Sequence, residues 1–241
     1  MAETKKPDSI IDRFREDIEQ YFGDALVSII LYGSAAGGEF QRKRSDINFL
    51  VVISQTGMER LAGIQKYIHP WRKKHISLPI FMTEAYIDAS LDSFPIEFLN
   101  MLNSYRLVTG KDVLAGLKLN KKDIRLQCER ELKGKLLQLR QQFILTRGRK
   151  AALRALISQS IVTFTAIFRA LLFIRGKEIP QNKQQVVLAV CREFTEIEES
   201  FFSELLGIRS GELKCGKKTL QDYVRKYIQQ IHDLSVAVDR L

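Results

Sequence analysis

Two short polar clusters, separated by eleven residues, are the part of this sequence whose residue types suit phosphate chemistry. Gly33 and Ser34 end one apolar run, and Asp46 and Asn48 open the next. A glycine lets the backbone approach a triphosphate closely, and a serine hydroxyl with neighbouring N–H groups donates to phosphate oxygens. Side chains at positions i and i+2 of a strand point to the same face, so Asp46 and Asn48 can face a common divalent ion. The residue types and spacing of the two clusters therefore suit contact with phosphate and with a cation.

The elements that must position these clusters are predicted to be two largely buried strands. Leu26 to Tyr32 and Ile47 to Ile53 are compact runs rich in β-branched and aromatic residues, and Gly, Ser or Asp bounds each of them. Ahead of them, apolar side chains at helical spacing predict an amphipathic helix over Asp8 to Phe22. Both polar clusters therefore lie in the connection between the first two strands.

Further elements are predicted before residue 117. Met58 to Ile68 has the pattern of a helix that stops before Pro70, and Ile76 to Met82 has that of a third strand. Because Pro79 cannot donate a ladder hydrogen bond, this third strand is expected at an edge of the sheet or to be irregular. A short strand is predicted at Arg106 to Thr109.

Beyond Leu117 the strand signals stop and helical periodicity takes over. Apolar side chains recur at helical spacing from Leu132 to Val238, which predicts a bundle of four or five helices. One of these helical faces runs from Leu153 to Leu171. The change in pattern predicts two domains, at residues 1–117 and 118–241.

The order of strand, Gly-Ser, spacer, Ser-Asp and strand in LYGSAAGGEFQRKRSDINFLVV resembles the nucleotidyltransferase superfamily. That superfamily includes antibiotic adenylyltransferases and minimal nucleotidyltransferases. The resemblance covers about residues 25–115, including the closing segment YRLVTGKDVL, and the following bundle resembles the helical domain of such proteins. It implies an α+β fold, with a nucleotidyltransferase-type mixed β-sheet and flanking helices, followed by an all-α helical bundle.

The same resemblance implies a reaction and its participants. A nucleoside monophosphate would pass from an NTP to a hydroxyl of an unidentified acceptor, with Mg²⁺ or Mn²⁺ as cofactor. Gly33 and Ser34 would bind the nucleotide, Asp46 would be the catalytic metal ligand, and Asn48 would occupy the second metal position.

Two positions depart from the family's pattern. Asn48 stands where a second carboxylate belongs, and a neutral amide does not replace the charge that Mg²⁺ prefers. The third carboxylate should fall within Ser77 to Met82, which contains no acid. Glu39 in the spacer and Glu84 after the third strand are candidates to replace it, although a solvated loop and a helix start are their simpler interpretations. We therefore expect impaired catalysis, and a catalytically silent binding or regulatory module is the alternative.

The positive charge of the chain is confined to its second half. Residues 1–117 contain 14 Lys+Arg and 15 Asp+Glu, whereas residues 118–241 contain 24 and 13. Twelve basic residues and three acidic ones lie between Lys118 and Arg154. A charged helix face often serves only solubility, but an excess of this size favours an anionic partner, either nucleic acid or an acidic protein. It also makes a cationic aminoglycoside an unfavourable substrate.

The sequence favours a reduced, cytoplasmic setting. Its three cysteines are widely spaced and lack any metal-ligand spacing, so free thiols are expected. The first ten residues contain no apolar stretch suited to a secretory signal, and Ile161 to Ile174 is too short and too interrupted by polar residues to cross a bilayer. We therefore expect no membrane partner.

Overall fold

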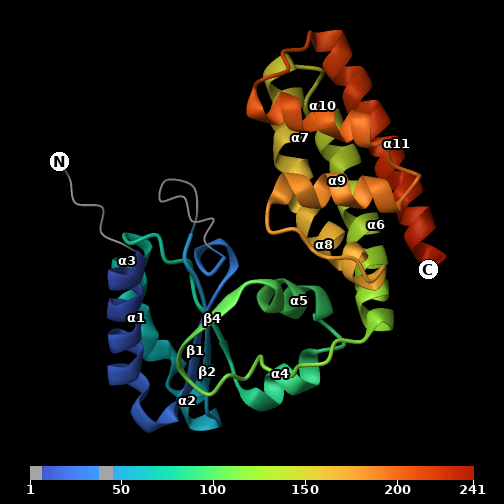
Figure 1. Cartoon of the computed structure of the whole chain (residues 1–241). Helices are drawn as coiled ribbons and strands as arrows, with labels where there is room; N and C mark the ends of the chain where they lie inside the picture. Colours follow the sequence, from blue (N-terminus) through green and yellow to red (C-terminus); the bar gives the residue numbers. More distant parts are fainter. Residues whose placement is uncertain (1–6, 38–45) are drawn as a thin grey trace. The chain divides into compact units, whose positions relative to one another are not determined.

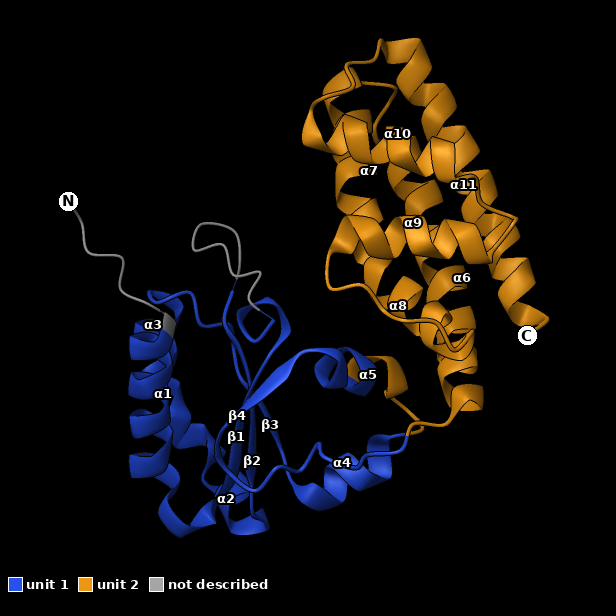
Figure 2. Cartoon of the chain, viewed as in Figure 1, with its two compact units in different colours: residues 1–91, 98–118 blue, residues 92–97, 119–241 orange. Residues whose placement is uncertain are grey.

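The structure is a computed structural model, and it describes residues 7–37 and 46–241. The chain forms two compact units, one built around a β-sheet and one helical (Figure 2). The first unit consists of residues 1–91 and 98–118, and the second of residues 92–97 and 119–241.

Among the described residues, four strands form a mixed sheet in the order β3-β2-β1-β4. The labels β1, β2 and β4 locate this sheet in Figure 1. Their bounds are β1 Leu26–Tyr32, β2 Asn48–Ile53, β3 Ile80–Met82 and β4 Tyr105–Gly110. β1 pairs antiparallel with both β2 and β4, while β2 pairs parallel with β3. The mixed sheet and the edge position of the third strand are thereby confirmed.

Both faces of the central strands are buried. Phe14 of helix α1 (Pro7–Phe22) stacks on Phe49 of β2, with ring centroids 3.9 Å apart, and also contacts Trp71. Alternate strand residues join this core, and the residues between them are equally buried on the opposite face of the sheet. The near-continuous apolar runs of β1 and β2 follow from this two-sided burial. The predicted helix over Asp8 to Phe22 is confirmed.

The helix predicted over Met58 to Ile68 is wrong in both its bounds. The structure has α2 at Gln55–Glu59, a 3₁₀ turn at Leu61–Ile64, and α3 at Gln65–Arg72 with Pro70 inside it. The break places Gly63 against Tyr21, where an added Cβ would lie 1.9 Å from the tyrosine oxygen. The close approach of two segments therefore overrides the local periodicity.

The continuation of α3 past Pro70 also has a tertiary cause. Trp71 is buried, and its indole Nε1 donates to Asp17 Oδ2 at 3.0 Å. Tyr67 stacks on the same indole ring. Packing against α1 thus stabilises the last turn of α3, which the sequence alone predicts to end before Pro70.

The third and fourth strands differ from their predicted lengths. β3 contains only Ile80 to Met82, and Ile76 forms a single bridge to Ile47 before Pro79 interrupts the ladder. β4 begins at Tyr105 and ends at Gly110, one residue longer at each end than predicted. Between them lie α4 (Glu84–Ser90) and α5 (Pro95–Asn103).

Residues 119–241, all of which the structure describes, form six helices rather than the predicted four or five. These are α6 Lys121–Leu145, α7 Lys150–Thr163, α8 Thr165–Ile174, α9 Lys183–Glu193, α10 Glu199–Ser210 and α11 Lys217–Asp239. The apolar face from Leu153 to Leu171 is divided between α7 and α8, which meet at Phe164. Phe164 packs in an aromatic cluster with Phe168 and Tyr227, so the apolar pattern continues although the helix does not.

One segment of this bundle is long and apolar enough to cross a membrane by length and composition alone. It spans Lys150–Ile174, and half of its apolar window is buried within the protein. Its residues Ile157, Phe168 and Leu171 have no exposed surface. Core helices of soluble bundles pass the same test of length and composition.

The three free cysteines differ in their environment, and we expect them to differ in reactivity. Burial raises the pKa of Cys128, and it raises the pKa of Cys191 to about 12, whereas Cys215 is partly exposed. Because the thiolate is the nucleophile, an aromatic disulfide reagent at pH 8 should modify one thiol per folded chain and three after denaturation. Cys215→Ser should abolish the reaction of the folded protein, and rapid modification of two thiols would contradict this expectation.

Candidate nucleotide-binding site

The first polar cluster forms a sharp turn at the end of β1. Gly33 has φ +78°, a left-handed conformation that a side chain would strain. Its N–H donates to the Ser104 carbonyl at 2.9 Å, and Ser104 Oγ donates back to the Gly33 carbonyl at 3.1 Å. A Cβ at Gly33 would lie 3.4 Å from Asn48 Nδ2. That distance is an ordinary van der Waals contact, so it is the backbone conformation that favours glycine here.

Three hydrogen-bond donors of the turn have no acceptor among the described residues. The Gly33 carbonyl accepts from the N–H groups of Ala36 at 2.9 Å and Gly37 at 3.1 Å, which closes the loop on itself. In the described part of the chain, the N–H groups of Ser34 and Ala35 and the Ser34 hydroxyl donate to no other group. Adjacent unpaired N–H and O–H donors on a tight turn are suited to phosphate oxygens.

The second polar cluster lies beside the first because of strand register. Asn48 is paired with Tyr32, the residue before Gly33. The Asn48 Oδ1 atom accepts a hydrogen bond from Ser77 Oγ at 2.6 Å. Ser77 is itself fixed by its N–H, which donates to the Ile47 carbonyl at 3.1 Å. The structure therefore brings Gly33, Asn48 and Ser77 together, and the acceptor oxygen of Asn48 is already engaged.

Asp46 provides the negative charge of this site. It is exposed and comes directly before Ile47, which is fully buried, so the side chains of Asp46 and Asn48 alternate with a core residue. In the described residues Asp46 has no ion-pair or hydrogen-bond partner. No group of three or more His, Cys, Asp or Glu side chains suited to a metal occurs within residues 7–37 and 46–241.

Glu84 does not supply the missing carboxylate. It lies in the first turn of α4 and forms an ion pair with Lys111, so its interpretation as a helix start is confirmed. β2 and β3 run parallel, with Leu50 opposite Ile80, so Asn48 and Glu84 lie toward opposite ends of the sheet. At about 3.3 Å per strand residue, the four residues from Asn48 to Val52, which pairs with Met82, span roughly 13 Å, and Glu84 lies two residues beyond Met82. Glu39 lies outside the described residues.

The donor set suits one hard cation better than two. Mg²⁺ is commonly held by one or two carboxylates together with substrate phosphates, and Asp46 beside the Gly33 turn can supply that arrangement. A two-ion site needs carboxylates that both ions share, and in the described residues Asn48 and Ser77 contribute only neutral oxygens. The charge at this edge of the sheet is therefore lower than the family pattern implies.

Ser77 and Ser104 are the site residues that the sequence pattern missed. Neither belongs to a recognisable motif, and each reaches the site through pairing with a distant segment. The sequence had drawn attention to Ser77 to Met82 only because this segment contains no acid. Only the register between β2 and the chain before β3 identifies Ser77 as the residue that contacts Asn48.

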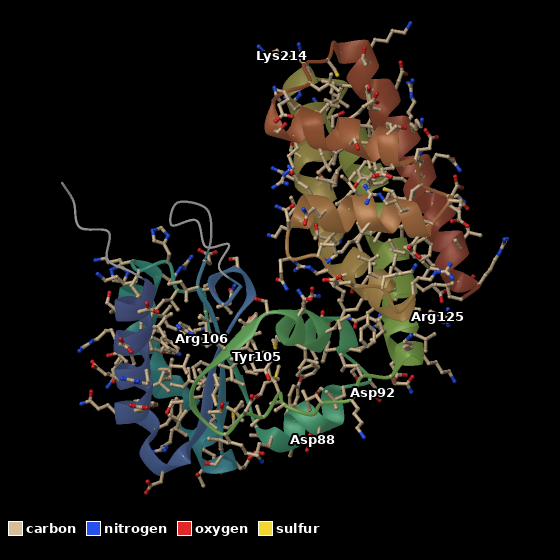
Figure 3. All side chains as sticks on the ribbon, in the orientation of Figure 1. Asp88, Asp92, Tyr105, Arg106, Arg125 and Lys214 are labelled. Carbon is tan, nitrogen blue, oxygen red and sulfur yellow. The ribbon has the colours of Figure 1, made fainter. Side chains whose placement is uncertain are left out.

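Two tyrosines paired across β1 and β4 flank the turn. Tyr32 lies opposite Tyr105, and Tyr105 is labelled in Figure 3. Burial raises the pKa of Tyr32; burial and the hydrogen bond to Asp112, at 3.1 Å, raise that of Tyr105. Both hydroxyls are therefore protonated and neutral at physiological pH.

The sheet with its Gly-Ser turn, followed by a helical unit, defines an α+β nucleotidyltransferase-type fold, as the sequence predicted. A solved structure similar to this chain is spectinomycin adenyltransferase AAD(9) from Enterococcus faecialis, determined with ATP and spectinomycin. The TM-score is 0.55 and the sequence identity 13%, and the similarity covers 93% of this chain and 98% of that one. No family model matches the sequence, and a search of curated proteins finds no match. At this identity the likeness shows the shared fold.

Proposed function

We propose that the α+β unit binds a nucleoside triphosphate at the Gly33 turn with one Mg²⁺ or Mn²⁺ ion on Asp46. We further propose that transfer of the nucleoside monophosphate to a hydroxyl acceptor is impaired. The donors of Ser34 and Ala35, which bond to no described residue, support nucleotide binding, as does the fold shared with an adenylyltransferase solved with ATP. A cytoplasmic location agrees with the three free thiols.

The Asn48–Ser77 hydrogen bond is the observation that carries this proposal. The family pattern requires a carboxylate at position 48, whereas here a neutral amide oxygen accepts from Ser77 Oγ at 2.6 Å. An amide and a hydroxyl that satisfy each other form a stable pair without a metal ion. They add no negative charge with which to hold a second cation.

The expected catalytic penalty is large. Removing one preorganised electrostatic contact from an active site commonly lowers kcat by about 10²–10³. Two missing carboxylates affect the same cations, so their effects are not additive, but each weakens the stabilisation of the charge that develops during phosphoryl displacement. We therefore expect nucleotide binding to survive better than turnover.

Calorimetric titration with ATP tests the binding step. In the unmodified protein, Mg²⁺ or Mn²⁺ should tighten ATP binding, because Asp46 would hold the cation and the cation would supply positive charge that offsets the phosphates. Asp46→Ala should make the affinity the same with and without the cation. Asp88→Ala, which removes an exposed acid from α4, is the control and should leave the cation dependence intact.

Two results would contradict the binding proposal. One is undetectable ATP binding by the unmodified protein at millimolar ATP and Mg²⁺. The other is an undiminished cation effect in Asp46→Ala. Release of pyrophosphate at a rate typical of active transferases would contradict the proposed impairment and leave nucleotide binding intact.

A second candidate is a catalytically silent module that engages an anionic macromolecule through its helical unit. The excess of basic residues over acidic ones in residues 118–241 favours it. The same charge disfavours a cationic antibiotic as acceptor for this chain. Titration with spectinomycin in the presence of ATP tests that point, and we expect no binding.

A further inference from the structure

One end of the helical unit gathers basic side chains from two distant segments, which we call the basic end surface. The segments are residues 147–154 and 209–218, and a single acid, Glu212, lies within them. Their basic residues are Arg147, Arg149, Lys150, Arg154, Arg209, Lys214, Lys217 and Lys218. Lys214, between α10 and α11, is labelled in Figure 3.

Close packing of glycines shows that the two segments meet. A Cβ on Gly148 would lie 3.4 Å from Lys217 Cε and 2.6 Å from Gln221 Nε2. A Cβ on Gly211 would lie 3.0 Å from Arg154 Nη2. The start of α7, the end of α10 and the start of α11 therefore share one surface.

The cations of this surface lack acidic partners among the described residues. None of the eight forms an ion pair with any residue that the structure describes. Elsewhere in the same unit, Lys133 pairs with Glu129, Lys177 with Glu193 and Arg192 with Glu199, as the exposed cations of a solvated helical protein commonly do. The end surface lacks this compensation.

Several of these cations occupy positions that oppose local stability. Arg147 has φ +49°, a left-handed conformation that glycine adopts at lower cost. Lys150 and Lys217 are the first residues of α7 and α11, where the helix dipole favours acidic side chains. Neither helix has a side-chain cap or an acid in its first turn. The requirements of the fold therefore do not explain the charge.

We propose that the basic end surface binds the phosphate backbone of single-stranded RNA or DNA without reading its sequence. The two segments contain no aromatic residue, so base stacking is not part of the contact. Arg130 and Arg140, two exposed residues of α6, also form no ion pair with any residue that the structure describes. A flexible polyanion can contact the end surface and these two arginines together. The nucleotide site lies in the other unit and plays no part.

An anionic membrane is the competing partner. Ile144 is 75% exposed and Leu145 61% exposed at the end of α6, and a bilayer could accept both. Leu145 also lines a groove of about 340 Å³ between α6 and α7. Two aliphatic side chains are a small apolar area beside eight cations, and Arg130 lies about 22 Å along α6 from its end, out of reach of a planar bilayer at the end surface. These features favour a single-stranded nucleic acid over a membrane. Binding to anionic vesicles is measured alongside as the competing outcome.

Fluorescence anisotropy with a short labelled single-stranded RNA measures this binding across NaCl concentrations of about 50 to 200 mM. The variant Arg147→Ala/Lys150→Ala/Lys218→Ala should bind at least tenfold more weakly at the lower salt. Each lost phosphate contact removes about 0.7 from the slope of log K against log salt, so the slope should fall by about 2. Arg72→Ala/Lys73→Ala/Lys74→Ala removes the same charge from exposed positions in the other unit, and it should leave both quantities unchanged.

Arg147→Gly separates a binding role from a structural one. Relief of the left-handed strain should raise the melting temperature or leave it unchanged, while RNA affinity falls. A loss of affinity accompanied by a loss of stability would count against the proposal. So would the absence of RNA binding at the lowest salt, equal losses in the two triple variants, or binding to phosphatidylserine vesicles without binding to RNA.

Discussion

Asn48→Asp is expected to raise the affinity for ATP in the presence of Mg²⁺ by at least about tenfold, which corresponds to about 1.4 kcal/mol. The substitution adds a carboxylate beside the Gly33 turn, two residues after Asp46. The cation would then have two charged ligands as well as the phosphates. Ser77 Oγ, now 2.6 Å from the amide oxygen, can donate equally well to a carboxylate, so the local geometry should survive.

The measurement is calorimetric titration with ATP, with and without Mg²⁺. Asn120→Asp is the matched control, because it adds the same charge at the N-cap of α6, where the side-chain oxygen already accepts from the Lys122 N–H. Asn120→Asp should stabilise α6 or leave its stability unchanged. It should not change the affinity for ATP. If Asn48→Asp leaves ATP binding unchanged while the Asp46→Ala substitution still abolishes the cation effect, position 48 has no role at the metal.

The rate of nucleotidyl transfer can also be compared between the unmodified protein and a variant with more acids at the site. Ser77→Asp combined with Asn48→Asp would return three acids to the site, one of them at a residue that the structure shows in contact with position 48. Pyrophosphate release by the double variant, above that of the unmodified protein, would indicate that charge was the missing component. No gain despite tighter ATP binding would indicate that the acceptor pocket is absent.

Phe14→Ala is expected to lower the unfolding free energy of the α+β unit by about 3–5 kcal/mol. The ring has no exposed surface, stacks on Phe49 with centroids 3.9 Å apart, and lies 4.8 Å from Trp71. Its removal leaves a cavity between α1 and the sheet that neighbouring strand residues cannot fill without breaking register.

The fluorescence of Trp71 during urea unfolding measures this loss in one unit, because Trp71 is the sole tryptophan of the chain and lies in the α+β unit. Leu78→Ala is the control. Leu78 is 68% exposed, so its truncation should change the unfolding free energy by no more than about 0.5 kcal/mol. A loss below about 1 kcal/mol in Phe14→Ala would show that the α1 contact contributes little to the unit's stability.

The local sequence pattern was sufficient to predict those helices and strands in which the role of each residue depends on its sequence neighbours. The apolar runs predicted β1 and β2 within one residue, and helical spacing predicted α1, because burial on two faces or on one stripe leaves a direct periodicity. It was insufficient where distant packing decides the outcome. Tyr21 against Gly63 divides α2 from α3, and Trp71 against Asp17 extends α3 past Pro70.

The candidate site divides in the same way. The sequence by itself determined the Gly33-Ser34 turn, the single acid Asp46 and the amide at position 48, because residue identity and spacing within one hairpin connection fix them. Only the tertiary structure decided that Ser77 satisfies Asn48, that Ser104 holds Gly33, and that Glu84 lies toward the opposite end of the sheet. It also decided that eight of the 24 basic residues in residues 118–241 belong to segments that meet at one end of the helical unit. Strand register and helix packing join segments tens of residues apart, and no local pattern records which residues those contacts bring together.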